Sequence, residues 1–328
     1  LFDPTTPDLV GCLPAYAEVE QEAKTQFDKY HPQSAGLLVN LDGHTVCRLF
    51  LGAYGPTTEV YTASAAKWLT AATILAAVDQ GTLRLDTRAV ELFPDVPAET
   101  ANIVVSQLLS HTSGLLWFSR CMGRPDRTLQ TCASDILWGD LQFDPGTGFF
   151  YSGPPFTVAG AMAERASGRP WAELFQMLIA EPLGMTHTSY GDSPNPALSE
   201  GEVATTLDDY GRFAQMILDQ GAGRRRRVLS PEAILEMRRS RTSSARGEPP
   251  YGLGVWLNVV DPAGVGTVLS SPGIGGFVPL VDYGRRMVFV FETFDDIDRI
   301  GPGISAILQV TRGVVDREHQ EIRAGRTP

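Results

Sequence analysis

The chain has 328 residues, 43% hydrophobic and 20% charged, with a formal net charge of −11, so it can build one large core or two closely packed ones. The negative charge disfavours a nucleic-acid partner, and we interpret the one basic cluster, residues 224–227, as a solvated loop. The longest nearly apolar run, residues 68–78, is about half of the roughly 20 residues that a spanning helix needs, so we predict no membrane span.

The N-terminal part is predicted to contain a helix over residues 15–27 and then a β-hairpin. Two apolar runs, residues 35–41 and 45–51, flank Asp42-Gly43. This dipeptide favours a tight turn between antiparallel strands.

The middle of the chain, from Ser64 to about residue 237, is predicted to be mainly helical. A first helix runs to about residue 80 and stops at Gly81. Thr206 begins another helix that Gly221 ends, and Ser230-Pro231 is typical of the start of a third.

Strand patterns return near the C-terminus, over residues 252–260, 265–270, 277–282 and 286–292, and a last helix is expected over residues 304–315. Strands at both ends of the chain around a helical middle predict an α+β fold. Its antiparallel sheet is built from the N- and C-terminal segments and flanked by helices. We expect residues 1–60 and 245–328 to form this sheet domain and residues 61–244 an inserted helical domain, with the active site between them.

Four cysteines are present without the spacing of a zinc or redox motif. Three disulfide connectivities are possible; we favour Cys121 with Cys132, because a short loop closes easily, and Cys12 with Cys47. The alternative is four buried thiols. The sequence starts at Leu1 rather than at methionine, which we interpret as the loss of an N-terminal segment, so a signal peptide cannot be read from it.

The strongest chemical signal is Ser64-Ala65-Ala66-Lys67 at the start of an apolar helix. A spacing of three places Ser64 and Lys67 on one helix face, and the free amide of Ser64 could donate to an oxyanion. Burial would weaken the hold of Lys67 on its proton, so that Lys67 could act as the base for Ser64. The chain has only three lysines against 24 arginines, and arginine cannot serve as a base. Taken alone, the motif also fits a helix cap followed by a snorkelling lysine.

Several further motifs occur in a fixed order, and with them the chain resembles the β-lactamase-related serine hydrolases. This group includes class C β-lactamases, D,D-carboxypeptidases and family VIII esterases. The resemblance extends from about residue 35 to 292. Its motifs are YTASAAK at 61–67, GTLRLD at 81–86, LLSHTSGL at 108–115, PGT at 145–147, PLGM at 182–185 and VLS at 228–230. The resemblance implies a β-lactamase/transpeptidase-like fold, with Ser64 as nucleophile and Lys67 as general base.

In that family the second motif is Tyr-x-Asn, and the matching residues here are Tyr151-Ser152-Gly153. The resemblance implies that Tyr151 is a proton shuttle, because a nearby cation such as Lys67 makes a phenol more acidic. The family's asparagine is replaced by Gly153, whose role is therefore not carried over. The alternative for Tyr151 is an aromatic side chain packed beside a Gly-Pro-rich loop.

The third motif of the family, Lys-Thr-Gly or His-x-Gly, falls on Ser271-Pro272-Gly273. The amide after its glycine, here that of Ile274, completes the oxyanion hole in relatives, and a backbone donor needs no particular side chain. The cation is missing, since Ser271 stands in its place, which puts the recognition of a substrate carboxylate in doubt. A glycine-rich turn between strands is the alternative interpretation.

His111 is an obvious candidate for a Ser-His-Asp triad, yet the chain has no Gly-x-Ser-x-Gly elbow. In the resembling family the corresponding histidine is structural and ties a turn together. Motifs for metal or nucleotide binding are also missing from the sequence, so we predict no cofactor. A further set of aromatic residues could line an apolar cleft or belong to the core: Tyr54, Trp117, Phe118, Phe149 and Phe150.

These observations predict a serine hydrolase that forms an acyl-enzyme on Ser64 and acts on a small ester or amide, most simply a carboxylesterase. The loss of the asparagine and of the third-motif cation argues against β-lactam and D-Ala-D-Ala substrates. A β-lactamase or D-Ala-type peptidase or amidase is the alternative, and a non-catalytic binding protein of the same fold is a second one. The family and the even number of cysteines predict a secreted or periplasmic protein.

Overall fold

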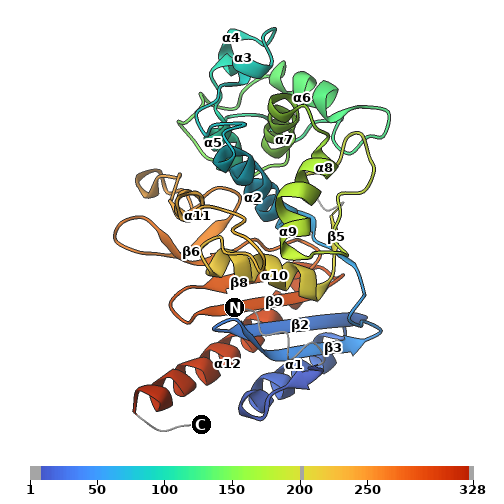
Figure 1. Ribbon diagram of the computed structural model, residues 1–328, viewed down its shortest axis with the longest axis vertical. Helices are drawn as coiled ribbons and strands as arrows, with labels where there is room; N and C mark the ends of the chain where they lie inside the picture. Colours follow the sequence, from blue (N-terminus) through green and yellow to red (C-terminus); the bar gives the residue numbers. More distant parts are fainter. Residues whose placement is uncertain (1–8, 200–202, 325–328) are drawn as a thin grey trace.

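A computed structural model describes residues 9–199 and 203–324. In this part of the chain the strands form a seven-stranded antiparallel sheet in the order β1-β3-β2-β9-β8-β7-β6 (Figure 1). The strands are β1 (Gly11–Cys12), β2 (Ser34–Leu41), β3 (His44–Gly52), β6 (Trp256–Val260), β7 (Gly266–Ser270), β8 (Val278–Asp282) and β9 (Met287–Thr293). N-terminal and C-terminal strands meet where β2 pairs with β9, which confirms the predicted fold class.

Helices cover both faces of the sheet because its strands are apolar on both faces. In β9, Phe289 and Phe291 point to one face, where α1 (Ala17–Tyr30) packs against α12 (Ile297–Arg323). Val288 and Val290 belong to the larger core on the other face. There α10 (Leu207–Leu218) packs on β2, β8 and β9 (Figure 1).

The remaining helices form a block above the sheet in Figure 1. At its centre is α2 (Ala66–Asp79), which is buried along nearly its whole length, and a short ladder of β4 (Val60–Tyr61) with β5 (Ala204–Thr205) leads into it. Around α2 lie α3 (Ala89–Leu92), α4 (Ala98–Ala101), α5 (Val105–Leu109), α6 (Leu129–Leu137), α7 (Pro154–Ser167), α8 (Trp171–Phe175), α9 (Glu181–Leu183) and α11 (Pro231–Arg238). The proposed division of the chain at residues 60 and 245 stays a prediction, and α10 from the middle segment lies on the sheet.

Local signals at the predicted turns and caps are confirmed. Asp42 and Gly43 both have positive φ, 49° and 85°, as a two-residue hairpin requires. Thr206 accepts a hydrogen bond from the amide of Asp209 at the start of α10, and Ser230 accepts one from the amide of Ala233 at the start of α11.

Two element boundaries differ from the prediction. The last helix was expected over residues 304–315 and runs from Ile297 to Arg323, with Pro302 inside it at a position where proline costs one intrahelical hydrogen bond. The strand expected from residue 252 begins at Trp256. The preceding residues turn instead, and Gly254, with φ of 74°, lies against α2 where a Cβ atom would be 2.7 Å from the Lys67 carbonyl.

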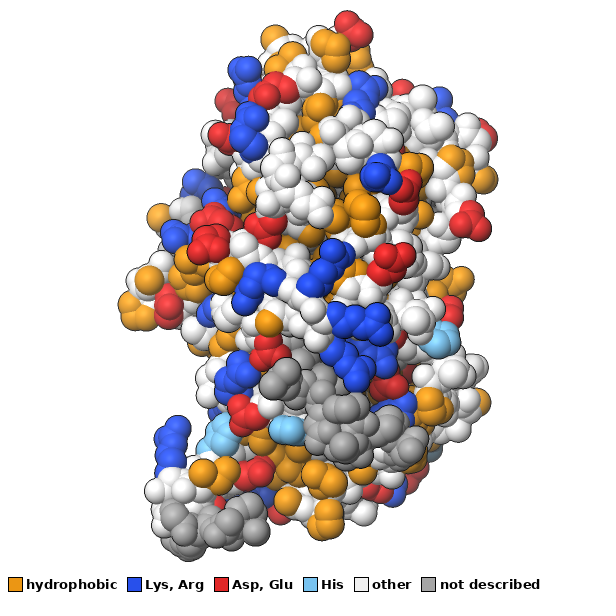
Figure 2. Space-filling view, in the orientation of Figure 1, with side chains coloured by type: hydrophobic (Ala, Val, Ile, Leu, Met, Phe, Trp, Pro, Cys, Tyr) orange, Lys and Arg blue, Asp and Glu red, His pale blue; other side chains and the backbone are white. Residues whose placement is uncertain are grey.

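Two disulfides join the cysteines in the favoured pairing, Cys12 with Cys47 and Cys121 with Cys132. In the described residues no helix is long and apolar enough to cross a membrane. Residues 224–227 are exposed, as predicted, in a turn where the amide of Gly223 donates to the carbonyl of Arg226. Figure 2 shows acidic and basic side chains interspersed on one face, with Lys and Arg gathered across its middle.

Candidate active site

Ser64 lies in a single 3-10 turn, Ala63–Ala65, between β4 and the start of α2. The chain is fixed just before this turn, because the amide of Thr62 donates to the carbonyl of Val203 at 3.0 Å. Ala63 has a φ of 46°, a left-handed conformation that is unfavourable for alanine. Such local strain is found where the surrounding structure holds a functional side chain in place. Ser64 lies in the turn directly before the first residue of α2, and its side chain is partly exposed.

Lys67 is buried, with 2% of its surface exposed, and its Nζ lies 3.3 Å from Ser64 Oγ. The same Nζ donates to the carbonyl oxygen of Ser199 at 2.7 Å. The structure thus brings together the serine and the lysine that the sequence singled out. Sequence reasoning missed Ser199, because its contribution is a backbone carbonyl and leaves no side-chain pattern.

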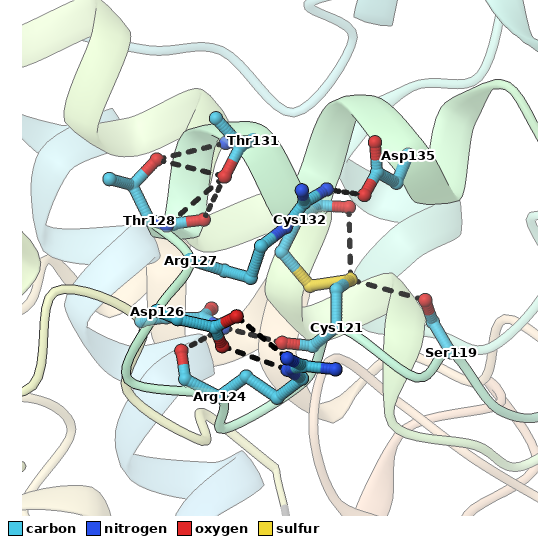
Figure 3. A network of polar contacts seen from close by, with 10 residues as sticks. Ser119, Cys121, Arg124, Asp126, Arg127, Thr128, Thr131, Cys132 and Asp135 are labelled. Atoms are coloured by element: carbon cyan, nitrogen blue, oxygen red, sulfur yellow. Dashed lines mark hydrogen bonds and ion pairs between the residues drawn. A yellow bond between two sulfur atoms is a disulfide. The ribbon is translucent and has the colours of Figure 1, made fainter.

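The segment that carries Ser199 is attached to its surroundings at several points. Thr70 Oγ1 on α2 donates to the carbonyl of Leu198 at 2.7 Å. Asn195 Nδ2 donates to the carbonyl of Cys121 at 2.6 Å. Figure 3 shows the polar network around Cys121, in which the disulfide with Cys132 joins the loop that carries Cys121 to α6. These contacts hold the acceptor of Lys67 in position.

Tyr151 reaches the same place from the loop before α7. Lys67 Nζ lies over the Tyr151 ring, 4.6 Å from its centroid. The ring is also stacked on Trp256, at a centroid distance of 5.0 Å and an interplanar angle of 26°. Trp256 begins β6 and pairs with Ser270 of β7, next to the third motif. The sequence did not single out Trp256, because an aromatic residue in a strand resembles core.

His111 is buried behind Tyr151, with ring centroids 4.5 Å apart. Its Nδ1 accepts a hydrogen bond from the amide of Ser152 at 3.2 Å, and its carbonyl accepts one from the amide of Phe150 at 2.9 Å. Burial, with a second contribution from Lys67 when that residue is protonated, holds the pKa of His111 well below its usual range, so the imidazole is neutral. His111 thus ties down the loop that carries Tyr151, the structural position that the resemblance implies.

The third-motif segment contacts the Ser64 turn directly. Ser271 is buried, and its Oγ donates to the carbonyl of Ser64 at 3.3 Å. Gly273 lies so close that a Cβ atom there would be 2.3 Å from the carbonyl oxygen of Thr62. Ile274 follows and is strongly exposed. This segment therefore lies against the turn that carries Ser64 but presents no cation, and the role of the Ile274 amide as an oxyanion donor stays a prediction.

Gly153 occupies the N-terminal cap position of α7, at φ of −85°. Its carbonyl accepts a hydrogen bond from the amide of Phe156 at 3.0 Å and one from Ser199 Oγ at 3.4 Å. Any residue can adopt this backbone conformation, so the backbone does not require glycine here. The replacement of asparagine therefore changes the chemistry of the site and not its backbone.

The other aromatic candidates separate into two groups. Phe149 packs against Tyr251 and Trp256 and so contributes to the aromatic wall behind Tyr151. Trp117 and Phe118 lie on the surface, with ring centroids 5.5 Å apart. Over residues 9–199 and 203–324 no group of three or more His, Cys, Asp or Glu side chains is arranged to hold a metal ion.

Comparison with known proteins extends these observations. A family model described as Beta-lactamase matches residues 19–296. The chain is 31% identical over 251 residues to penicillin-binding protein 4 of Amycolatopsis lactamdurans, covering 64% of this chain and 66% of that protein. It is 32% identical over 142 residues to esterase EstB of Burkholderia gladioli, covering 38% and 36%. The chain thus spans less than two thirds of the length of these curated relatives.

Among solved structures, the fold is similar to that of a putative beta-lactamase from Bacteroides dorei. The TM-score is 0.80 at 28% identity, and the match covers 92% of this chain and 99% of that one. The agreement extends over the sheet and the helical block together.

Proposed function

The chain belongs to the beta-lactamase family, and on that premise we propose that it is a serine hydrolase that forms an acyl-enzyme on Ser64 and acts on carboxylic esters. The observation that carries the proposal is the contact of 3.3 Å between Lys67 Nζ and Ser64 Oγ beside the Tyr151 ring. A serine hydroxyl becomes a nucleophile when a neighbouring base takes its proton.

In the acylation step, neutral Lys67 accepts the proton of Ser64 while one of its N–H groups donates to the Ser199 carbonyl. Ser64 Oγ forms a bond to the ester carbonyl carbon, and the carbonyl oxygen becomes an oxyanion. The amides of Ser64 and Ile274 donate to this oxyanion. The hydrogen bond of Ser271 Oγ to the Ser64 carbonyl keeps the two segments together.

The leaving alcohol then takes a proton through Tyr151, which Lys67 re-protonates, and an acyl-enzyme results. In the second half, water gives a proton to the same pair and attacks the acyl carbon. The Ser64–acyl bond breaks, Ser64 regains its proton, and the acid is released. Ester and water are consumed and acid and alcohol are formed, with the enzyme unchanged.

The substituted motifs support an ester rather than a lactam as substrate. Ser271 stands where relatives have a cation, and its hydroxyl is turned to the backbone of Ser64. Gly153 offers no side-chain amide to a substrate amide. Groups that hold the carboxylate and amide of a β-lactam are therefore missing from both motif positions, whereas an ester needs only the nucleophile, the base and the oxyanion donors.

Similarity to a penicillin-binding protein over 64% of the chain favours a second candidate, acyl transfer from a D-Ala-type peptide or a β-lactam. The same Ser64 acyl-enzyme would form, and only the acyl donor would differ. Substrate comparison decides between the two.

The two disulfides support placement of the protein in an oxidising compartment, secreted or periplasmic, since such bonds persist there and are rare in the cytosol. Fractionation of the native host with the disulfides trapped by alkylation tests this placement. Recovery of the protein with free thiols from the cytosol would contradict it.

The function is tested with purified protein beside its Ser64→Ala variant, with p-nitrophenyl butyrate and the cephalosporin nitrocefin as substrates and a fluorophosphonate as active-serine label. We expect ester turnover and labelling in the wild type and neither in the variant. Preferential nitrocefin turnover would select the second candidate. Absence of both turnover and labelling would indicate a non-catalytic binding protein.

A further inference from the structure

Large apolar side chains are exposed next to the proposed nucleophile. Phe294 and Ile274 are 73% and 72% exposed, more than any other large hydrophobic residue in the described chain. Tyr61, three residues before Ser64, is 55% exposed. Exposed apolar surface is unfavourable in water, and a cluster of it at one place marks a binding surface.

Ile274 and Phe294 belong to neighbouring segments, one of which contacts the turn that carries Ser64. Ile274 directly follows Gly273, which lies against the carbonyl of Thr62. Phe294 lies beside the same turn, since a Cβ atom on Gly275 would be 4.0 Å from Phe294 Cδ2. A ligand that covers Ile274 and Phe294 would therefore lie beside the segment that contacts the Ser64 turn.

The turn that carries Ile274 is held by backbone hydrogen bonds. The amide of Gly276 donates to the carbonyl of Gly273 at 3.0 Å, and the amide of Ile297 donates to the carbonyl of Ile274 at 2.9 Å. The amide of Asp295 donates to the carbonyl of Gly275 at 2.9 Å, which joins the turn to the residue after Phe294. The apolar side chains thus lie on a fixed surface, which reduces the entropy lost when a ligand binds.

The charges next to this surface are mainly negative. Asp295, Asp296 and Asp298 lie where the chain enters α12, and Arg299 is the one cation among them, paired with Asp295. Asp296 caps the helix by accepting from the amide of Asp298 at 2.9 Å. A substrate that carried a carboxylate onto this surface would meet like charge, whereas an uncharged apolar group would not.

We propose that Ile274 and Phe294 form the subsite for the apolar part of the substrate, so that the enzyme acts on uncharged esters with a hydrophobic acyl chain and discriminates against acyl chains that end in a carboxylate. This inference rests on the proposed esterase function and narrows its substrate class. The acyl chain lies on these two side chains while its carbonyl carbon is at Ser64 Oγ.

The first test measures kcat/KM for p-nitrophenyl acetate, butyrate and octanoate with the wild type, Phe294→Ser and Phe294→Leu. We expect the wild type to prefer octanoate over acetate by at least about tenfold, since each buried methylene improves transition-state binding. Phe294→Ser should lose about tenfold on octanoate and less than about twofold on acetate, and Phe294→Leu should restore the preference. Ile322→Ser is the matched control, because Ile322 is 56% exposed near the other end of α12.

The second test compares p-nitrophenyl hexanoate with the mono-p-nitrophenyl ester of adipic acid, which has the same chain length but ends in a carboxylate. We expect kcat/KM for the hexanoate to exceed that for the adipate ester by at least about tenfold. This ratio should be smaller in Asp298→Asn, because that change removes one of the repelling charges.

The outcomes separate the two proposals. Three results would overturn the inference and leave the esterase function standing. They are ester turnover with no dependence on chain length, equal losses of Phe294→Ser on acetate and octanoate, and equal turnover of the two six-carbon esters. No turnover of any ester together with no fluorophosphonate labelling of Ser64 would overturn the proposed function itself.

Discussion

Trp256 stacks on Tyr151 with the two ring centroids 5.0 Å apart, and this contact links β6, the strand paired with the one before the third motif, to the proposed proton shuttle. The Tyr151 ring is held by Trp256 and His111, while Lys67 Nζ lies 4.6 Å from its centroid. The position of the phenol therefore depends on residues from three separate parts of the chain.

Replacing Trp256 with alanine should lower kcat for p-nitrophenyl butyrate by about tenfold, because the Tyr151 ring loses a stacking partner and its phenol leaves the line of proton transfer. Trp256→Phe should restore most of the rate, since a smaller ring still stacks. The pH profile of kcat checks that the effect acts through Tyr151: its limbs should move in Trp256→Ala and return in Trp256→Phe. A lower melting temperature with unchanged kcat and pH profile would show that Trp256 is only structural.

Lys67→Arg should lower kcat by at least about 10²-fold, because a guanidinium does not give up its proton and cannot act as general base. Arginine keeps the positive charge that a protonated lysine would carry, so the rate would be nearly unchanged if Lys67 acted only as a cation. Lys24→Arg is the control, as Lys24 lies on α1 in an exposed pair with Glu20. Ester turnover by Lys67→Arg at the wild-type rate would exclude Lys67 as the base.

Local patterns explain which parts of the site could be predicted from sequence. Ser64 and Lys67 are three residues apart, so one helical turn brings them together whatever the rest of the chain does. Tyr151 was placed by its motif. Ser199 and Trp256 could not be placed in this way, because their contributions depend on segments 135 and 105 residues further along the chain than Ser64 and Tyr151 respectively. Only the tertiary structure shows these contacts.

The elements of the fold that were predicted correctly are also specified by local sequence. Asp42-Gly43 specifies its hairpin locally, and Thr206 specifies the start of α10. The true start of α12 was missed because Pro302 is a helix breaker in most positions, and sequence alone does not show that it lies in the first turns of a longer helix.

Gly273→Ala should lower kcat by about 10²-fold or more, because the added Cβ would lie 2.3 Å from the carbonyl oxygen of Thr62 and force the third-motif turn away from Ser64. The proposed oxyanion donor at Ile274 would move with it. Gly301→Ala is the matched control, since a Cβ there meets no atom within 4 Å. Rates of ester hydrolysis and fluorophosphonate labelling check the prediction, and wild-type labelling of Gly273→Ala would contradict the close approach.

Glu292 gives a prediction about stability rather than activity. It is buried in β9 opposite Gly36, where a Cβ atom would lie 2.7 Å from Glu292 Oε1. Neither carboxyl oxygen has a hydrogen-bond partner in the part of the chain that the structure describes. Burial, with a smaller contribution from the charge of Asp208, raises the pKa of Glu292 from 4.5 to about 8.

A raised pKa means that the folded protein keeps the Glu292 proton where the unfolded chain has released it. The contribution of Glu292 to stability is therefore complete below pH 4.5 and is lost as the pH rises to about 8. Glu292→Gln cannot ionise, so the free energy of unfolding of this variant should fall less between pH 5 and pH 8 than that of the wild type. Urea unfolding at a series of pH values measures the two slopes, with the exposed Glu321→Gln as control. Parallel slopes for wild type and Glu292→Gln would show that Glu292 is already ionised in the folded protein, in contact with water or a cation.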